Sequence, residues 1–109
     1  MALILAAASP LEAQTDLAGA QAAFRTGKYE AAIGAFSRLA VGPTPSRAAI
    51  TGLVESYRAV GRLAEAETTA RRAPVAANAL GEVLYQRGKL AEAEQAFRQA
   101  VSRPGPDSL

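Results

Sequence analysis

The feature that most constrains the fold of this chain is a short pattern that occurs three times. In each copy a Gly is followed by a cation, a bulky apolar residue, a nearby Glu and, five residues after the Gly, an Ala. The copies begin at Gly27, Gly61 and Gly88, and Phe36 and Phe97 each lie nine residues after their own Gly. Three copies in 109 residues indicate a repeat architecture, because self-similarity along a chain is the sequence signature of stacked structural units.

Apolar residues spaced three and four positions apart predict helices on both sides of each Gly. Ala is abundant and β-branched residues do not alternate, so the sequence favours helix over strand. Thr15 or Asp16 is expected to cap the first helix, and Thr44 or Ser46 to cap the third, with Pro45 at a first helical position. Six helices are predicted, at about residues 15–26, 29–41, 46–60, 63–73, 75–87 and 90–102.

The predicted helices are joined in two ways: by a single Gly within a pair, and by a segment with Pro between pairs. Each Gly-joined pair would be an antiparallel hairpin that cannot bury its apolar face alone, so the hairpins are expected to stack as an α-solenoid. Ala32, Ala66 and Ala93 would let the two helices of a hairpin approach closely. Phe36 and Phe97 are expected to fill the gap to the neighbouring hairpin.

In the third copy, several residues match the signature of the tetratricopeptide repeat family in order and spacing: Leu80-Gly81, Leu84, Gly88, Ala93, Phe97, Ala100 and Pro104. The chain therefore resembles that family over about residues 15–106. The resemblance implies an all-α fold, an α-solenoid of three antiparallel helical hairpins in a right-handed superhelix, with repeats at 15–43, 46–73 and 75–103. Gly27 and Gly61 are 34 residues apart, but Gly61 and Gly88 are only 27 apart, so the second repeat is predicted to be truncated.

Residues 1–14 resemble the second half of a secretory signal, with an apolar run, Pro10 and small residues after it, and cleavage after Ala8 or Ala13 is conceivable. No Lys or Arg precedes the run, and the run is too short to span a bilayer. We expect export to a periplasm or to the outside; the alternative is an uncleaved apolar tail or a misassigned start, and a cytoplasmic protein. Residues 104–109 are predicted to be a disordered tail.

Composition removes several classes of function. The chain has no Cys and no His, which excludes thiolate nucleophiles, histidine bases and zinc sites built on either residue. The net charge of +2 is spread along the chain and does not predict a nucleic-acid surface. The acidic pairs Glu65/Glu67 and Glu92/Glu94 are two residues apart, so their side chains diverge by about 200° on a helix. We interpret them as solvated helix faces and predict neither enzymatic activity nor a cofactor or metal.

The family resemblance implies a concave groove lined by the first helix of each pair, and a non-catalytic scaffold that binds a peptide or protein there. The candidate partner-binding residues are Gln21, Phe24, Arg25, Glu55, Arg58, Asn78, Glu82 and Tyr85. The two Arg would take ligand carboxylates, Asn78 would bond the ligand backbone, and the two rings would be apolar anchors. The alternative is that these residues form the solvated face of a solenoid.

No polar capping helix is predicted after Ser102, so part of the apolar surface of the last helix is expected to be bare. Self-association, a partner or a further C-terminal segment could each cover it. The chain could therefore also be a fragment or an assembly subunit of a larger repeat protein.

Overall fold

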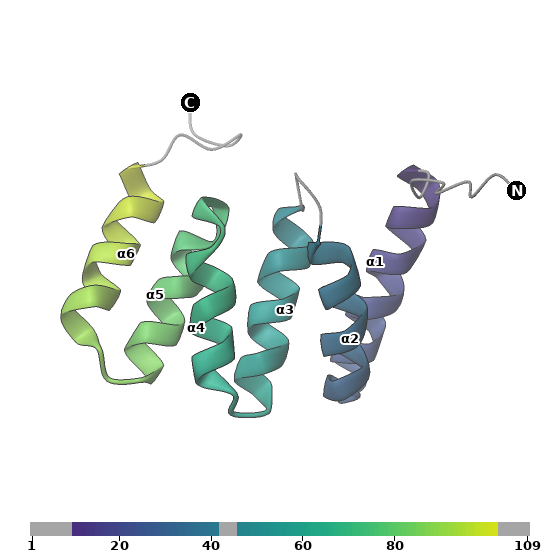
Figure 1. Cartoon of the computed structure of the whole chain (residues 1–109), viewed down its shortest axis with the longest axis horizontal. Coiled ribbons are helices and arrows are strands. Elements are labelled where there is room, and N and C mark those ends of the chain that lie inside the picture. The colour runs from purple at the N-terminus through teal and green to yellow at the C-terminus, as the bar shows by residue number, and fades with distance from the viewer. Residues whose placement is uncertain (1–9, 42–45, 103–109) are drawn as a thin grey trace, which may run out of the picture.

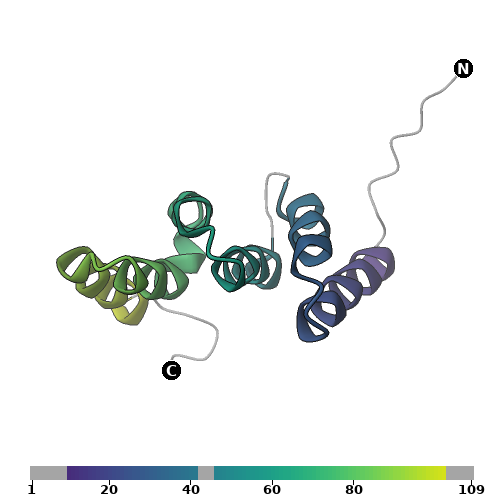
Figure 2. The ribbon, with the colours of Figure 1, turned by 90° about the horizontal axis from the view of Figure 1, so that it is seen from below.

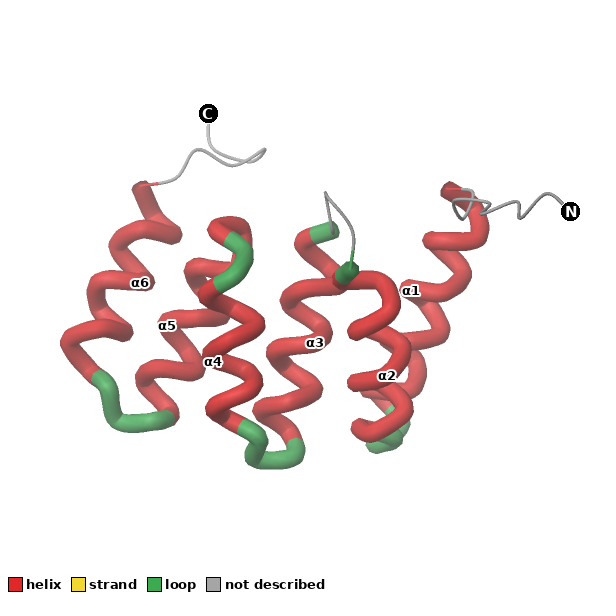
Figure 3. The backbone as a smooth tube through the Cα atoms, viewed as in Figure 1, coloured by secondary structure: helices red, strands yellow, loops and turns green. Residues whose placement is uncertain are grey.

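The structure is a computed structural model that describes residues 10–41 and 46–102, and these residues form six α-helices and one short 3₁₀ turn, with no strand among them (Figures 1 and 3). The elements are α1 Pro10–Arg25, α2 Tyr29–Ala40, α3 Arg47–Ala59, α4 Leu63–Arg71, η1 Pro74–Ala76, α5 Ala77–Gln86 and α6 Leu90–Ser102. Each helix packs on the next one along the chain, and α3 also contacts both α1 and α5. Seen along the helices, α2 and α4 lie on one side of the row and α1, α3 and α5 on the other (Figure 2). The predicted α-solenoid of helical hairpins is confirmed.

The joint within each hairpin has the same geometry in all three copies. At the first, Gly27 N donates a hydrogen bond to Phe24 O (3.1 Å), and Lys28 N donates to Ala23 O (2.8 Å). Gly27 has a φ of 79°, in the left-handed region that glycine adopts without steric cost. This pair of bonds is a Schellman motif, which satisfies carbonyls left free at the end of a helix. Gly61 and Gly88 repeat both the bonds and the positive φ, so the repeated glycines set where each hairpin turns.

The first helix begins earlier than predicted. The sequence predicts a start at Thr15 or Asp16 and assigns Pro10 to the signal-like segment, but α1 begins at Pro10. Proline is accepted at the first helical position, because its missing N–H has no partner there in any case. Residues 1–9 and 103–109 lie outside the described residues, so the predicted leader is described only from Pro10 and the predicted C-terminal tail not at all.

The start of α3 agrees with one of the two predicted caps. Ser46 Oγ accepts a hydrogen bond from Ala49 N (3.1 Å), which satisfies one of the free amides of the first turn. The other predicted cap, Thr44, and Pro45 lie outside the described residues, and the helix begins after them at Arg47.

The second hairpin is shortened, as the 27-residue spacing predicted. Helix α4 has 9 residues, whereas α2 has 12 and α6 has 13. It ends at Arg71 and not at Ala73 as predicted, because the residue before a proline is disfavoured in helical conformation and Ala73 is extended (φ −130°, ψ 112°). Pro74 then starts a 3₁₀ turn, so α5 begins at Ala77 and not at Val75.

The two repeat phenylalanines differ in burial although they occupy equivalent positions. Phe36 is 2% exposed, and its ring lies against Gly52 of α3, so it fills the gap between the first and second hairpins as predicted. The corresponding prediction for Phe97 is wrong, because its ring packs on Gly81 of its own hairpin and is half-buried. The reason is positional: among the described residues no hairpin follows α6.

Candidate functional site

Helices α1, α3 and α5 carry all eight residues predicted to bind a partner, but the structure places them in three different surroundings. A groove of about 400 Å³ lies between α1 and α3. Four of the eight residues line it: Gln21, Phe24, Arg25 and Glu55. The remaining lining residues are Phe36, Ala48, Thr51 and Gly52.

The floor of this groove is apolar because the ring of Phe36, on α2, lies directly against Gly52, on α3. A Cβ at Gly52 would overlap Cε1 of the Phe36 ring, so position 52 has room only for hydrogen. Phe24 forms one wall, and its half-buried ring packs edge-on against Tyr29, with 5.4 Å between centroids and 66° between planes. This contact holds the Phe24 ring in place, and a fixed aromatic side chain loses little conformational entropy on binding.

The rim of the same groove is polar. Gln21 and Arg25 are exposed on α1, and Thr51 is half-buried on α3. Arg25 makes no side-chain ion pair or hydrogen bond among the described residues, so its five N–H donors face solvent at the end of the groove. The groove therefore combines an apolar floor with several polar groups on its rim, the usual composition of a ligand site.

The second group of predicted residues forms a closed network between α3 and α5. Arg58 Nη1 lies 2.8 Å from Glu55 Oε1 and 2.7 Å from Glu82 Oε2. Its Nε donates to Gln86 Oε1 (2.9 Å), and Asn78 Nδ2 donates to Glu82 Oε1 (3.2 Å). Arg58 was predicted to bind a carboxylate of the ligand, but its guanidinium is already paired with two carboxylates of the chain itself. The network instead fixes the first helix of the second hairpin against that of the third.

The eighth predicted residue, Tyr85, stands apart from the other seven. Its side chain is 67% exposed, and it lines a second groove of about 600 Å³ along α6 at the end of the row. Tyr85 and Phe24 occupy equivalent positions, three residues before their Gly, as the sequence predicted. Only Phe24 has a following hairpin beside it among the described residues, so only Phe24 lies in a groove between two hairpins.

Among the described residues, Glu67 is the carboxylate with the most cationic partners, and sequence reasoning missed it. Glu67 is 8% exposed, and its carboxylate accepts hydrogen bonds from Arg71 Nε (2.9 Å), Arg87 Nη1 (2.8 Å) and Lys89 Nζ (3.1 Å). Burial raises the pKa of the Glu67 carboxyl, but the hydrogen bonds and charges of Arg71 and Lys89 outweigh it and hold the pKa below its ordinary value.

The interpretation of Glu67 as part of a solvated helix face is therefore wrong, whereas Glu65 on the same helix is exposed, as expected. The contacts of Arg87 and Lys89 with Glu67 join residues 20 and 22 positions apart, so they depend on tertiary structure. One signal in the sequence was available: cations stand at both flanks of Gly88, at Arg87 and Lys89, as they do around no other repeat glycine.

In residues 10–41 and 46–102, carboxylates do not gather in groups of three that could hold a metal ion. Over the same ranges, no helix has both the length and the apolar character that crossing a membrane requires.

Comparison with known proteins gives one match. The family model described as tetratricopeptide repeat matches the chain twice, over residues 17–79 and 51–108. The two matches together run from the middle of α1 to beyond the end of α6. No curated protein and no solved structure matches the chain.

Proposed function

Because this chain belongs to the tetratricopeptide repeat family, a family whose repeats are typical of protein–protein interaction, we propose that it is a non-catalytic scaffold that binds a peptide segment of a partner protein in the α1–α3 groove. The observation that carries the proposal is the groove itself, with its apolar floor at Phe36 and Gly52 and its polar rim. Its volume of about 400 Å³ accommodates one or two peptide side chains and is too small for a folded element.

The lining residues define the chemistry of the ligand. An apolar side chain would pack between the ring of Phe24 and the floor formed by Phe36 and Gly52, where burial of apolar surface is favourable. A carboxylate close to it, from an acidic residue or a chain end, would pair with Arg25. Gln21 and Thr51 each offer a donor and an acceptor for the ligand backbone. The proposed ligand is therefore an extended segment with an apolar residue next to an acidic one.

The other predicted residues would support this site from a distance. Arg58, held by Glu55 and Glu82, fixes the angle between α3 and α5, and it keeps Glu55 beside the groove neutralised. With Glu55 paired, Arg25 is the charge on the rim that remains available for an anionic ligand.

The test uses a peptide library displayed on phage and selected against the whole chain, with binding of the selected peptides measured by fluorescence anisotropy. Arg25→Glu is expected to weaken peptides that carry a carboxylate at least about tenfold, because an attractive pair becomes a repulsive one. Arg38→Glu is the matched control: it too replaces an Arg in the last turn of a helix of the first hairpin, but Arg38 lines a different surface with Asp16 and Leu39. Equal affinity of wild type and Arg25→Glu for every selected peptide would remove this groove as the binding site.

We also propose that the protein is exported, on the basis of the apolar run and small residues in 1–14. The bounds of α1 favour one of the two conceivable cleavage positions. Cleavage after Ala13 would remove the first turn of α1, whereas cleavage after Ala8 leaves the whole helix from Pro10 onward. N-terminal sequencing of the protein from its native cell is expected to start at Ser9. Recovery with residues 1–8 still attached would favour the cytoplasmic interaction module instead.

A further inference from the structure

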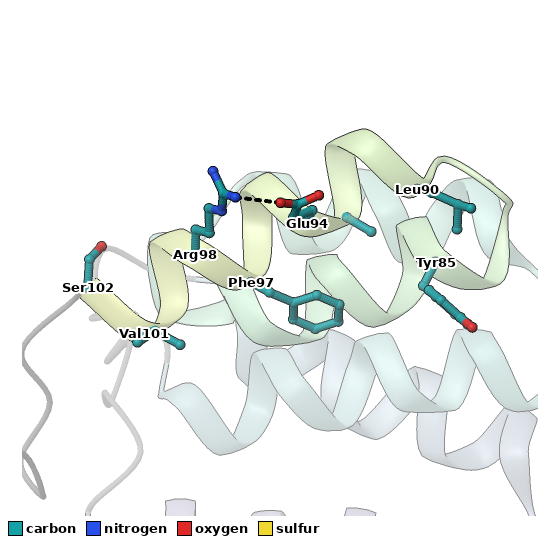
Figure 4. A pocket seen from close by; sticks show the side chains of 8 residues that line it. Tyr85, Leu90, Glu94, Phe97, Arg98, Val101 and Ser102 are labelled. Atoms are coloured by element: carbon teal, nitrogen blue, oxygen red, sulfur yellow. Dashed lines mark hydrogen bonds and ion pairs between the residues drawn. The ribbon is translucent and has the colours of Figure 1, made fainter.

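The residues that line the groove along α6 suit one occupant in particular. This holds whether or not a peptide binds in the α1–α3 groove. The groove has a volume of about 600 Å³, and it is open at the end of the row. Most of its lining comes from one face of α6: Leu90, Ala93, Glu94, Phe97, Arg98, Val101 and Ser102. Leu90 is 60% exposed and Val101 is 87% exposed, so two aliphatic side chains stand open at its two ends. Figure 4 shows these residues with the ring of Phe97 between them.

Comparison with the first hairpin shows what normally covers this face. Phe97 is equivalent to Phe36, and the groove beside Phe36 is closed on its far side by the next helix, α3. Among the described residues α6 has no such neighbour. The position equivalent to buried Ile33, however, is Glu94, and the position equivalent to Ser37 is Arg98. The end face is therefore not a copy of the internal junction, because it carries a charge pair where the junction has Ile33 and the uncharged Ser37.

The order of residues along this face is symmetric in chemistry. From one end to the other it reads aliphatic at Leu90, acidic at Glu94, aromatic at Phe97, basic at Arg98 and aliphatic at Val101. Glu94 and Arg98 lie together on one rim, joined by an ion pair of 2.6 Å within the chain (Figure 4). If a second α6 lies antiparallel to the first about a twofold axis near residue 96, each Glu94 comes opposite the Arg98 of the other copy. Each Leu90 then comes opposite Val101, and the two Phe97 rings lie near the axis.

We propose that the α6 end face is the interface of a symmetric homodimer in which two copies of this chain pack α6 against α6 antiparallel. A twofold interface requires a self-complementary surface, and the sequence of charges on α6 meets that requirement without help from another protein. The twofold axis is perpendicular to the plane of the two helices, so the charged rims of both copies fall on the same side. The contact between two helices and their flanking side chains buries less surface area than a standard protein–protein interface. The dissociation constant is therefore expected to be on the order of 10 μM.

The test is sedimentation velocity on the whole chain over a wide concentration range, with charge reversal at the rim. Glu94→Arg alone and Arg98→Glu alone each place like charges across the axis, and each is expected to raise the dissociation constant at least about tenfold. The double variant Glu94→Arg/Arg98→Glu restores opposite charges and is expected to dimerise like wild type. An equimolar mixture of the two single variants is expected to form a heterodimer, because each then supplies the charge that the other needs.

Val101→Lys tests the apolar part of the interface and is expected to weaken the dimer likewise.

Both charged side chains are more than half exposed, so the variants are expected to stay folded, and far-ultraviolet circular dichroism checks this. A wild-type monomer at all concentrations would overturn the proposal and would point to another partner or to residues 103–109 as the cover. Oligomers larger than dimers would also overturn it, because they indicate head-to-tail contact. If neither single variant weakens the dimer, the interface lies elsewhere. The same conclusion follows if the double variant does not restore dimerisation.

Discussion

Phe36→Ala is expected to lower the free energy of unfolding by about 3–5 kcal/mol, the range for truncating a buried aromatic side chain. The ring is 2% exposed and lies between two hairpins, against Gly52, with Ala20, Ala32 and Leu53 in the same apolar cluster. Gly52 has no side chain that could move into the vacated space, so the cavity would persist. Because a solenoid is stabilised by contacts between neighbouring repeats, losing this ring would weaken the attachment of the first hairpin to the second. Urea titration followed by far-ultraviolet circular dichroism measures the change.

Phe97→Ala is the matched control for this prediction. Phe97 is equivalent in the repeat and also packs on a glycine, where a Cβ on Gly81 would come within 2.6 Å of its ring. It is half-buried, and one side of its ring faces the open groove, so its truncation is expected to cost about 1–2 kcal/mol in the monomer. Equal losses for the two variants, measured below the concentration at which the chain associates, would contradict the claim that Phe36 is buried by the next hairpin.

The hairpins could be predicted from the sequence because their determinants are local. A glycine at the end of each first helix adopts a positive φ, and the same two backbone hydrogen bonds close all three turns, so the spacing of Gly27, Gly61 and Gly88 determines the fold. The proline positions were harder to interpret. The sequence predicts Pro10 in the signal-like segment and Pro74 in the joint between two hairpins, yet Pro10 starts a helix and Pro74 starts a 3₁₀ turn. A proline is compatible with the start of a helix and with its end, and tertiary packing decides between them.

The candidate site could be predicted only where the repeat itself determines which way a side chain faces. Phe24, Gln21 and Arg25 fall on the groove side of α1 as the periodicity indicated. The pairing of Arg58 with Glu82 joins residues 24 positions apart, in different hairpins. Helical periodicity predicts which face a residue occupies, but the partner on the next hairpin depends on the angle at which the hairpins stack. For the same reason the contribution of Gly52 to the groove floor was not apparent from the sequence.

Glu67→Gln is expected to lower the free energy of unfolding at pH 7 by about 2 kcal/mol, because three cations lose the carboxylate that accepts their hydrogen bonds. Glu67 is 8% exposed, and Arg71, Arg87 and Lys89 converge on it from α4 and from the turn between α5 and α6. The side chains of the cations are between 32% and 47% exposed, so water screens part of the loss, and the cost stays below that of breaking a fully buried pair. The network joins the shortened second hairpin to the third.

Glu65→Gln is the control on the same helix. Arg62 binds Glu65 through two hydrogen bonds, of 2.8 and 2.6 Å, but both side chains are at least 40% exposed. Exposed ion pairs contribute about 1 kcal/mol or less, so this variant is expected to stay close to wild type. An equal loss of unfolding free energy for Glu65→Gln and Glu67→Gln would contradict this prediction. It would mean that neither the burial of Glu67 nor its contact with the third hairpin adds to stability.

The pH dependence of the free energy of unfolding is a second test of the Glu67 network. The direction of the Glu67 pKa shift determines whether stability rises or falls with pH. The pKa of Glu67 in the folded chain lies below the ordinary value of 4.5, so the folded state binds its proton less readily than the unfolded state. The stability that the carboxylate contributes is therefore fully present above about pH 5 and is lost as the pH falls through the folded-state pKa. Because Gln resembles a protonated Glu in shape and charge, the difference between wild type and Glu67→Gln is expected to shrink over that interval and to vanish below it. A difference that stays constant from pH 7 to pH 3 would show that the carboxylate's charge is not what holds these hairpins together.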